Sequence, residues 1–145
     1  QQYNPNGTKQ IRNDEKHRDQ LKYFTFSGDE GEWARIGKKK LTAWGFDSLS
    51  VGGSVLYVAE GVFDAVKLQN AGLPALAVIA NDPKHLRPLF RALGRTIIAI
   101  CDRDDAGGKL ANCADISFSV PEPHHDLGDM TQKQVESFLR SKGLL

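Results

Sequence analysis

The sequence has little cysteine and no long apolar run. Its two cysteines, Cys101 and Cys113, lack the Cys-x-x-Cys spacing of zinc or redox motifs and are too few for a disulfide framework. No apolar run approaches the ~20 residues that a membrane-spanning helix requires, and no secretory signal pattern opens the chain. We therefore expect a protein of the reducing cytoplasm that does not enter a membrane.

Methionine and net charge are also scarce. The only methionine is Met130 and the chain begins Gln1-Gln2, so we expect a piece of a longer protein. The formal net charge of +1 indicates no particular class of partner. The distribution is more informative, because basic residues are scattered through residues 1–50 whereas acidic residues gather where predicted strands end.

Two short apolar segments organise the rest of the chain. Residues 55–59 and 96–101 are rich in β-branched side chains, a pattern typical of buried strands in a parallel sheet. Each is followed at once by carboxylates: Glu60-Gly61 after the first, and Asp102-Arg103-Asp104 after the second. In open α/β sheets, ligands bind beyond the carboxyl ends of the strands. Carboxylates placed there predict a site that meets a cation.

The segments between and after these strands alternate in type. We predict helices over 62–71, from Asp82-Pro83 onward, over 106–114 and after Thr131, whose pairing with Gln134 predicts a capping box. Further strands are predicted at 75–79 and 116–120. This alternation predicts an α/β domain over 51–145, with about four mainly parallel strands flanked by helices. Residues 1–50 are predicted to form a tail and a small basic antiparallel subdomain.

Three acidic groups occupy comparable places after strands. Residues two apart on an extended chain project to the same side, so two of the aspartates can converge on one ion while Arg103 points away. Hard oxygen ligands of this kind favour Mg²⁺ or Mn²⁺. The alternative to a metal site is that these carboxylates are ordinary polar residues at strand ends. We interpret His124-His125 as a pair of exposed loop histidines. The predicted ligands are Glu60, Asp102, Asp104, Asp126 and Asp129.

These motifs resemble the Toprim family, the catalytic fold shared by primases, topoisomerases and some nucleases. Glu60-Gly61 with Asp64 is similar to the first Toprim motif, and Asp102-Arg103-Asp104 with Ala106-Gly107 is similar to its Asp-x-Asp motif. The resemblance extends over residues 54–145. It implies that Glu60, Asp102 and Asp104 are catalytic, and that a third acidic motif supplies metal ligands. Asp126 and Asp129 match the position of that motif but not its tight spacing.

Within the family, the bacterial and phage DNA primases are the closest likeness. Their Toprim core follows a basic segment similar to Lys38-Lys39-Lys40, with Trp44-Gly45-Phe46 behind it. The resemblance implies a nucleotidyltransferase that joins ribonucleoside triphosphates into RNA primers on a single-stranded DNA template. It further implies that Lys38, Lys39 and Lys40 hold template or nucleotide, and that a replicative helicase or a fused helicase domain is a partner.

Two other interpretations remain open. A Toprim nuclease or topoisomerase fragment would share the acidic motifs, although a topoisomerase also needs a nucleophilic tyrosine. Of Tyr3, Tyr23 and Tyr57, none is well placed, because they fall in a tail, a predicted hairpin and a predicted buried strand. The third interpretation is a non-catalytic module that binds nucleotide or nucleic acid, in which binding would survive loss of Glu60 and of the aspartate pair.

Overall fold

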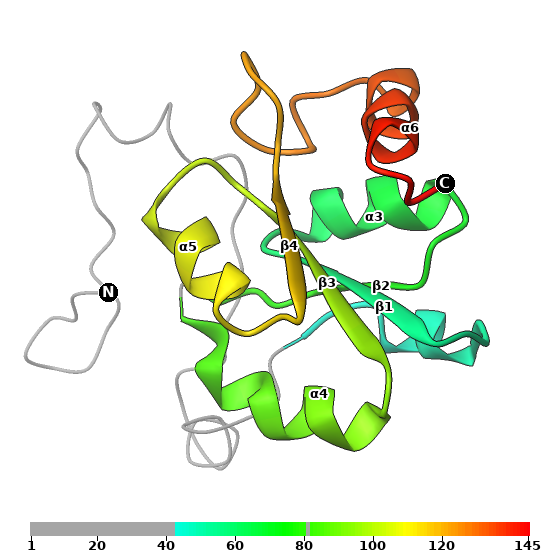
Figure 1. Cartoon of the computed structure of the whole chain (residues 1–145), viewed down its shortest axis with the longest axis vertical. Helices are drawn as coiled ribbons and strands as arrows, with labels where there is room; N and C mark the ends of the chain where they lie inside the picture. Colours follow the sequence, from blue (N-terminus) through cyan, green and yellow to red (C-terminus); the bar gives the residue numbers. More distant parts are fainter. Residues whose placement is uncertain (1–42, 81) are drawn as a thin grey trace, which may run out of the picture. The chain divides into compact units, whose positions relative to one another are not determined.

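The computed structural model describes residues 43–80 and 82–145, all within one compact unit, Lys39–Leu145 (Figure 1). The three lysines Lys38, Lys39 and Lys40, and most of the predicted antiparallel subdomain, lie outside the described residues. The end of that segment, residues 43–50, packs onto the sheet. Trp44 and Ala77 exchange backbone hydrogen bonds of 2.8 and 3.0 Å as an isolated antiparallel bridge.

A four-stranded parallel sheet forms the centre of this unit. Its strands are β1 (Val55–Ala59), β2 (Ala75–Ala77), β3 (Thr96–Cys101) and β4 (Ile116–Ser119), in the order β2-β1-β3-β4. Every pairing between neighbouring strands is parallel. The predicted α/β class with a four-stranded parallel sheet is therefore confirmed.

Helices connect the strands and cover both faces of the sheet (Figure 1). They are α3 (Val62–Asn70), α4 (Arg87–Leu93), α5 (Asp105–Ala111) and α6 (Gln132–Ser141), with the 3-10 helices η1 (Phe46–Ser50) and η2 (Pro83–Leu86). The predicted caps are present. Asp82 accepts a hydrogen bond from the Lys84 amide, and Thr131 forms a capping box with Gln134.

Strict alternation along the strands divides the core into two layers. Tyr57 and Ala59 of β1 face α3 and α6, whereas Leu56 and Val58 face η2, α4 and α5. These four residues are at most 5% exposed. The core therefore fixes the sheet rigidly from both sides, and so it also fixes the positions of the residues that follow each strand.

The strand order creates a crevice between β1 and β3. From β1 the chain leaves through α3 towards β2, and from β3 it leaves through α5 towards β4, on the opposite side. Neighbouring strands whose connections diverge in this way form a topological switch point, where open α/β sheets bind ligands. Because Val58 pairs with Ala99, Glu60 and Asp102 both emerge at this crevice.

The structure shifts the predicted ends of two elements by two residues or more, and those of α3 and β4 by one residue each. β2 ends at Ala77 rather than at residue 79, because Ile79 adopts a left-handed backbone with φ of 49°. α5 ends at Ala111 rather than at residue 114. Among the described residues, no helix is both long and apolar enough to cross a membrane.

Candidate carboxylate site

Glu60 lies at the carboxyl end of β1 with an unsatisfied oxygen. The side chain is partly buried, and Gly61 directly after it is the N-cap of α3. Glu60 Oε1 is buried and has no hydrogen-bond partner within the described part of the chain. A buried polar atom without a partner is costly, and such atoms often mark a position that a ligand or ion fills.

Asp102 and Asp104 follow β3, and the structure gives them different environments. Asp102 is partly buried, whereas Asp104 is exposed and caps α5, accepting hydrogen bonds from Ala106 N at 2.8 Å and Gly107 N at 2.9 Å. Arg103 forms an ion pair with Glu122 at 2.5 Å and lines the same pocket as the two aspartates. The expected divergence of Arg103 from them stays a prediction. The cap leaves Asp104 one carboxylate oxygen that is not engaged by the helix.

Gly107 allows α5 to start directly against Asp102. A Cβ atom added to Gly107 would overlap the Asp102 carbonyl oxygen, and would lie 3.0 Å from its carbonyl carbon and 3.1 Å from its nitrogen. Gly108, its neighbour, has open space at the same position. Residue 107 must therefore lack a side chain for Asp102 to stand where it does.

Asp64 ties the first acidic segment to the last. Its side chain, 6% exposed, accepts hydrogen bonds from the amides of Gly61 at 3.1 Å and Gly128 at 2.8 Å. The expectation that Asp64 positions the turn after β1 agrees with this geometry. The bond to Gly128 also holds the loop that contains Asp126 and Asp129 against α3.

A second contact fixes that loop beside the Asp-x-Asp segment. The amide of Arg103 donates to the carbonyl oxygen of His125 at 3.2 Å. Within the loop, Asp126 Oδ1 accepts from the Asp129 amide at 2.7 Å, and Asp129 accepts from the His125 amide at 3.4 Å. The three acidic segments, separate in sequence, therefore meet at the carboxyl ends of the strands.

Crowding of these carboxylates raises two pKa values. Burial, followed by the charges of Asp64, Glu60, Asp126 and Asp104, raises the pKa of Asp102 to about 8. Burial, then the charges of Asp104 and Asp64, raises the pKa of Glu60 to about 7, although a hydrogen bond from the Asp102 backbone opposes the rise. Asp126 thus lies within electrostatic reach of Asp102.

The carboxylate oxygens of this site are chemically suited to bind a hard divalent cation. Closely spaced carboxylates, one with an unsatisfied oxygen, are the ligands that Mg²⁺ and Mn²⁺ prefer, and a cation would relieve their repulsion. Among residues 43–80 and 82–145, however, no three His, Cys, Asp or Glu side chains are already gathered into a metal-binding group. The residues that could hold an ion are Glu60, Asp102, Asp104 and Asp126, and Asp129 stays a predicted ligand.

An open pocket of about 540 Å³ adjoins the carboxylates. Its lining includes Asp102, Arg103 and Asp104 after β3 and the hydroxyl-bearing residues Ser117 and Ser119 of the edge strand β4. Gly107 and Gly108 of α5 also line it. This space is large enough for a ligand of nucleotide size to approach the carboxylates.

Sequence reasoning missed Ile79 as a member of this region. Its φ of 49° is unusual for a β-branched residue, and its amide donates to the Glu60 carbonyl oxygen at 3.1 Å. The side chain is 43% exposed although it is apolar. Backbone strain of this kind is found at functional sites. The apolar run at 75–79 gave no signal for it, because the run matches an uninterrupted strand.

The histidines behave in part as expected. His125 is exposed, whereas His124 is partly buried and its Nε2 lies 3.4 Å from Gln134 Nε2.

Comparisons of the chain with protein-family models, curated proteins and solved structures found no match. Functional interpretation of this site therefore depends on its residues and geometry.

Proposed function

We propose that this chain is part of the Toprim catalytic core of a bacterial or phage-type DNA primase, which synthesises RNA primers on single-stranded DNA. One observation carries the proposal. Glu60, Asp102, Asp104 and Asp126 come from three separate segments and interact electrostatically at the switch point of a parallel sheet. The parallel sheet, the glycine after Glu60 and the close approach of Gly107 all agree with the Toprim motifs in the sequence.

The carboxylates have distinct roles in this proposal. Asp102, Asp104 and Asp126 would hold Mg²⁺ or Mn²⁺, which when bound supplies charge neutralisation for phosphoryl transfer. Glu60, with a pKa of about 7, is able to accept a proton near neutral pH. This is required when a primer 3′-hydroxyl attacks the α-phosphate of a ribonucleoside triphosphate and pyrophosphate leaves. Asp64 and Gly107 act through position only.

The topoisomerase alternative lacks a nucleophile in the described residues. Tyr57 is the only tyrosine there; it is 5% exposed, and its hydroxyl donates to the Leu144 carbonyl oxygen at 3.3 Å. Burial also raises the pKa of Tyr57, which disfavours the phenolate. This favours primer synthesis over strand transfer. A Toprim nuclease shares the carboxylates and is separated from a primase by the product.

The test supplies the full chain with single-stranded DNA, labelled ribonucleoside triphosphates and Mg²⁺. The proposal predicts short labelled RNA, lost in Glu60→Gln and retained in Tyr57→Phe. Shortened DNA without RNA would indicate the nuclease instead. DNA binding that persists in Glu60→Gln, with no product of either kind from the unmodified chain, would favour the non-catalytic binding module.

A further inference from the structure

A second pocket lies at the end of the sheet opposite to the carboxylates, where the amino end of β3 is found. It has a volume of about 290 Å³ and is bounded by α4, the amino end of β3 and the segment between α5 and β4. Phe90 and Ile97 are among its lining residues, and each is only 3% exposed. We call it the arginine pocket; its lining residues are Arg87, Phe90, Arg91, Arg95, Ile97, Asn112, Cys113, Ala114 and Asp115.

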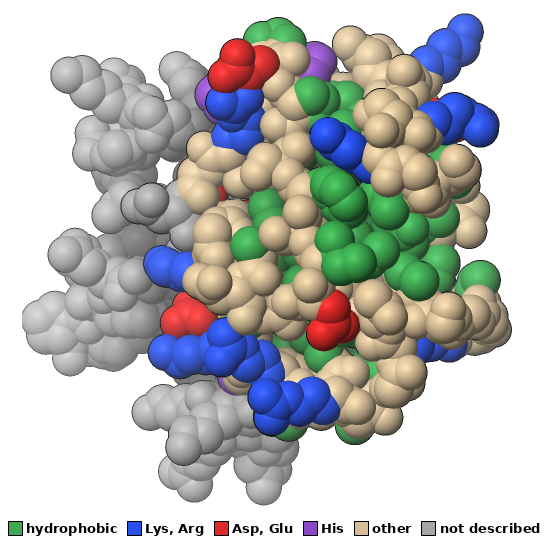
Figure 2. All heavy atoms as spheres, in the orientation of Figure 1, with side chains coloured by type: hydrophobic (Ala, Val, Ile, Leu, Met, Phe, Trp, Pro, Cys, Tyr) green, Lys and Arg blue, Asp and Glu red, His purple; other side chains and the backbone are tan. Residues whose placement is uncertain are grey.

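Three guanidinium groups border this pocket. Arg87 and Arg91 are four residues apart on α4 and therefore share one face of the helix, and Arg95 follows just beyond its end. Figure 2 shows Lys and Arg side chains gathered along the lower edge of the molecule, over η2 and α4. The helix dipole accounts for a cation in the last turn, such as Arg91, but not for Arg87 in the first turn.

Backbone carbonyl groups orient two of the arginines without neutralising them. Arg87 Nη2 donates to the Asn112 carbonyl oxygen at 2.6 Å. Arg95 donates to the carbonyl oxygens of Leu49 and Val51 at 2.9 and 3.1 Å. A guanidinium has five N–H donors, so both arginines retain donors for another acceptor. The Arg91 side chain is exposed and makes no hydrogen bond or ion pair with another described residue.

Among the described residues that line the pocket, a single carboxylate opposes these charges. Asp115 lines the pocket, and its side chain accepts a hydrogen bond from the Ile97 amide at 2.7 Å, which holds it against the sheet. Three guanidinium groups and one carboxylate leave a formal charge of +2 in the pocket. An excess of positive charge, with free fork-shaped donors, suits a phosphate group.

We propose that the arginine pocket binds a phosphate of a single-stranded nucleic acid whose other part occupies the carboxylate site. β3 connects the two, and its six residues separate them by roughly 17–20 Å. A strand bound by a protein groove commonly covers ~4–16 nucleotides, which is enough to span both. The choice of a nucleic acid over a free phosphate compound rests on the proposed function; binding of phosphate itself does not.

Cys113 provides a built-in reporter of occupancy. It lines the pocket and carries a free, partly buried thiol. The other thiol, Cys101, is 3% exposed, and burial raises its pKa to about 12, so it reacts far more slowly. The rate at which a neutral maleimide alkylates Cys113, followed by intact mass, therefore measures access to the pocket.

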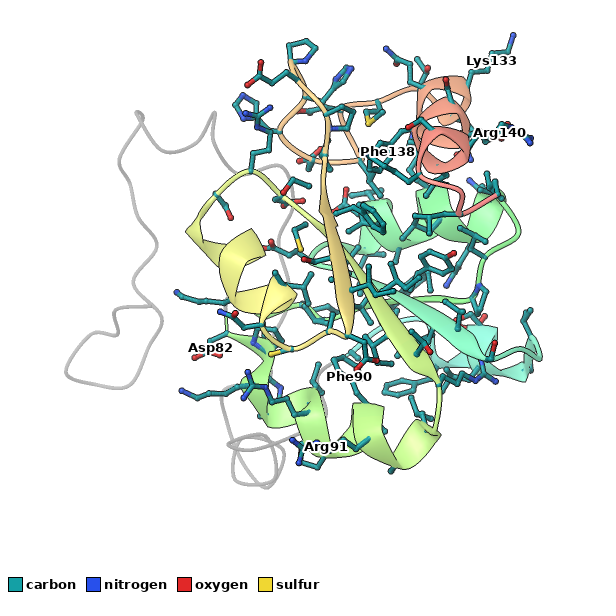
Figure 3. The ribbon with its side chains drawn as sticks, viewed as in Figure 1. Asp82, Phe90, Arg91, Lys133, Phe138 and Arg140 are labelled. Atoms are coloured by element: carbon teal, nitrogen blue, oxygen red, sulfur yellow. The ribbon has the colours of Figure 1, made fainter. Side chains whose placement is uncertain are left out.

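The experiment uses the full chain in EDTA, so that the outcome does not depend on a bound metal or on catalysis. A 12-nucleotide oligo-dT should slow alkylation of Cys113. The affinity of the chain for this oligonucleotide should fall about 5–10-fold in Arg91→Ala. The slope of the logarithm of the binding constant against the logarithm of the salt concentration should become shallower by about 1. The control is Arg140→Ala, an exposed arginine in the last turn of α6, on the far side of the molecule from Arg91 (Figure 3).

Three results would overturn the proposal. One is an unchanged affinity and salt slope in Arg91→Ala; another is an equal loss in Arg140→Ala, which would indicate diffuse attraction instead of a pocket. The third is equal protection of Cys113 by pyrophosphate and by oligo-dT at the same phosphate concentration, which would exclude a strand. Oligonucleotide binding in EDTA is measured separately from primer synthesis in Mg²⁺, so failure of the proposed function and failure of this pocket are distinguishable.

Discussion

The carbonyl group of Asp102 fills the space where Gly107 would carry a Cβ atom. We therefore expect Gly107→Ala to displace Asp102 or the start of α5, at a cost of about 1–3 kcal/mol typical of an overpacked site. Gly108→Ala is the matched control, since nothing lies within 4 Å of the position that its Cβ atom would take. It should gain up to ~1 kcal/mol from helix propensity. Urea denaturation of both variants tests this; equal stability of the two would show that the contact is relieved without cost.

The raised pKa values predict that stability falls as pH rises. Asp102 and Glu60 have pKa values of about 8 and 7, against ordinary values of 3.8 and 4.5. Between about pH 4 and pH 8 the folded chain therefore holds more protons than the unfolded chain, which makes the slope of unfolding free energy against pH negative. Without divalent metal, urea denaturation should show lower stability at pH 8 than at pH 5. Asp102→Asn should make this slope less negative. The pKa assignment would be contradicted if the stability of the unmodified chain rose over this range and Asp102→Asn had the same slope.

Asp64 should control both the loop and the charge of Asp102. Asp64→Asn keeps one acceptor oxygen for the two amides of Gly61 and Gly128, so one loses its partner at a cost of about 1–3 kcal/mol. It also removes the largest charge contribution to the pKa of Asp102, which should fall. Carboxyl titration by NMR measures this shift. Asp47→Asn, an exposed residue of η1, is the control and should leave the Asp102 titration unchanged.

The left-handed backbone of Ile79 is expected to lower the stability of the folded chain. Asparagine tolerates the left-handed backbone better than a β-branched residue, so Ile79→Asn should stabilise the chain by about 1 kcal/mol. Ile116→Asn is a matched control, because Ile116 is similarly exposed (46% against 43%) but lies in β4. It should give no gain. Thermal unfolding compares the two, and a loss of stability in Ile79→Asn would mean that its apolar contacts outweigh the strain.

The sequence predicted the strands better than their arrangement. The runs Val55–Ala59 and Thr96–Cys101 are visible because each is apolar, β-branched and closed by carboxylates. The end of β2 was predicted wrongly, since Ile79 continues an apolar pattern while its backbone turns. Local pattern carries no information on strand order, so the switch point between β1 and β3 was not predictable.

The site was predictable residue by residue but not as a geometry. Asp-x-Asp and Glu-Gly are local signals, whereas the approach of Asp126 to Asp102 depends on the Gly128–Asp64 bond across 64 positions. The arginine pocket was missed for the same reason. The spacing of Arg87, Arg91 and Arg95 is visible in the sequence, but the opposite wall comes from residues 112–115. Lys38, Lys39 and Lys40 stay predictions, because they lie outside the described residues.

The most direct test of the central claim is a Mn²⁺ titration of the full chain, read by paramagnetic broadening. The account predicts saturable binding that broadens residues around Glu60, Asp102 and Asp126. Asp102→Asn/Asp104→Asn should abolish it, and Asp47→Asn should not. Binding that survives the double substitution, or broadening confined to another part of the chain, would contradict the assignment of this carboxylate cluster as the metal-dependent centre.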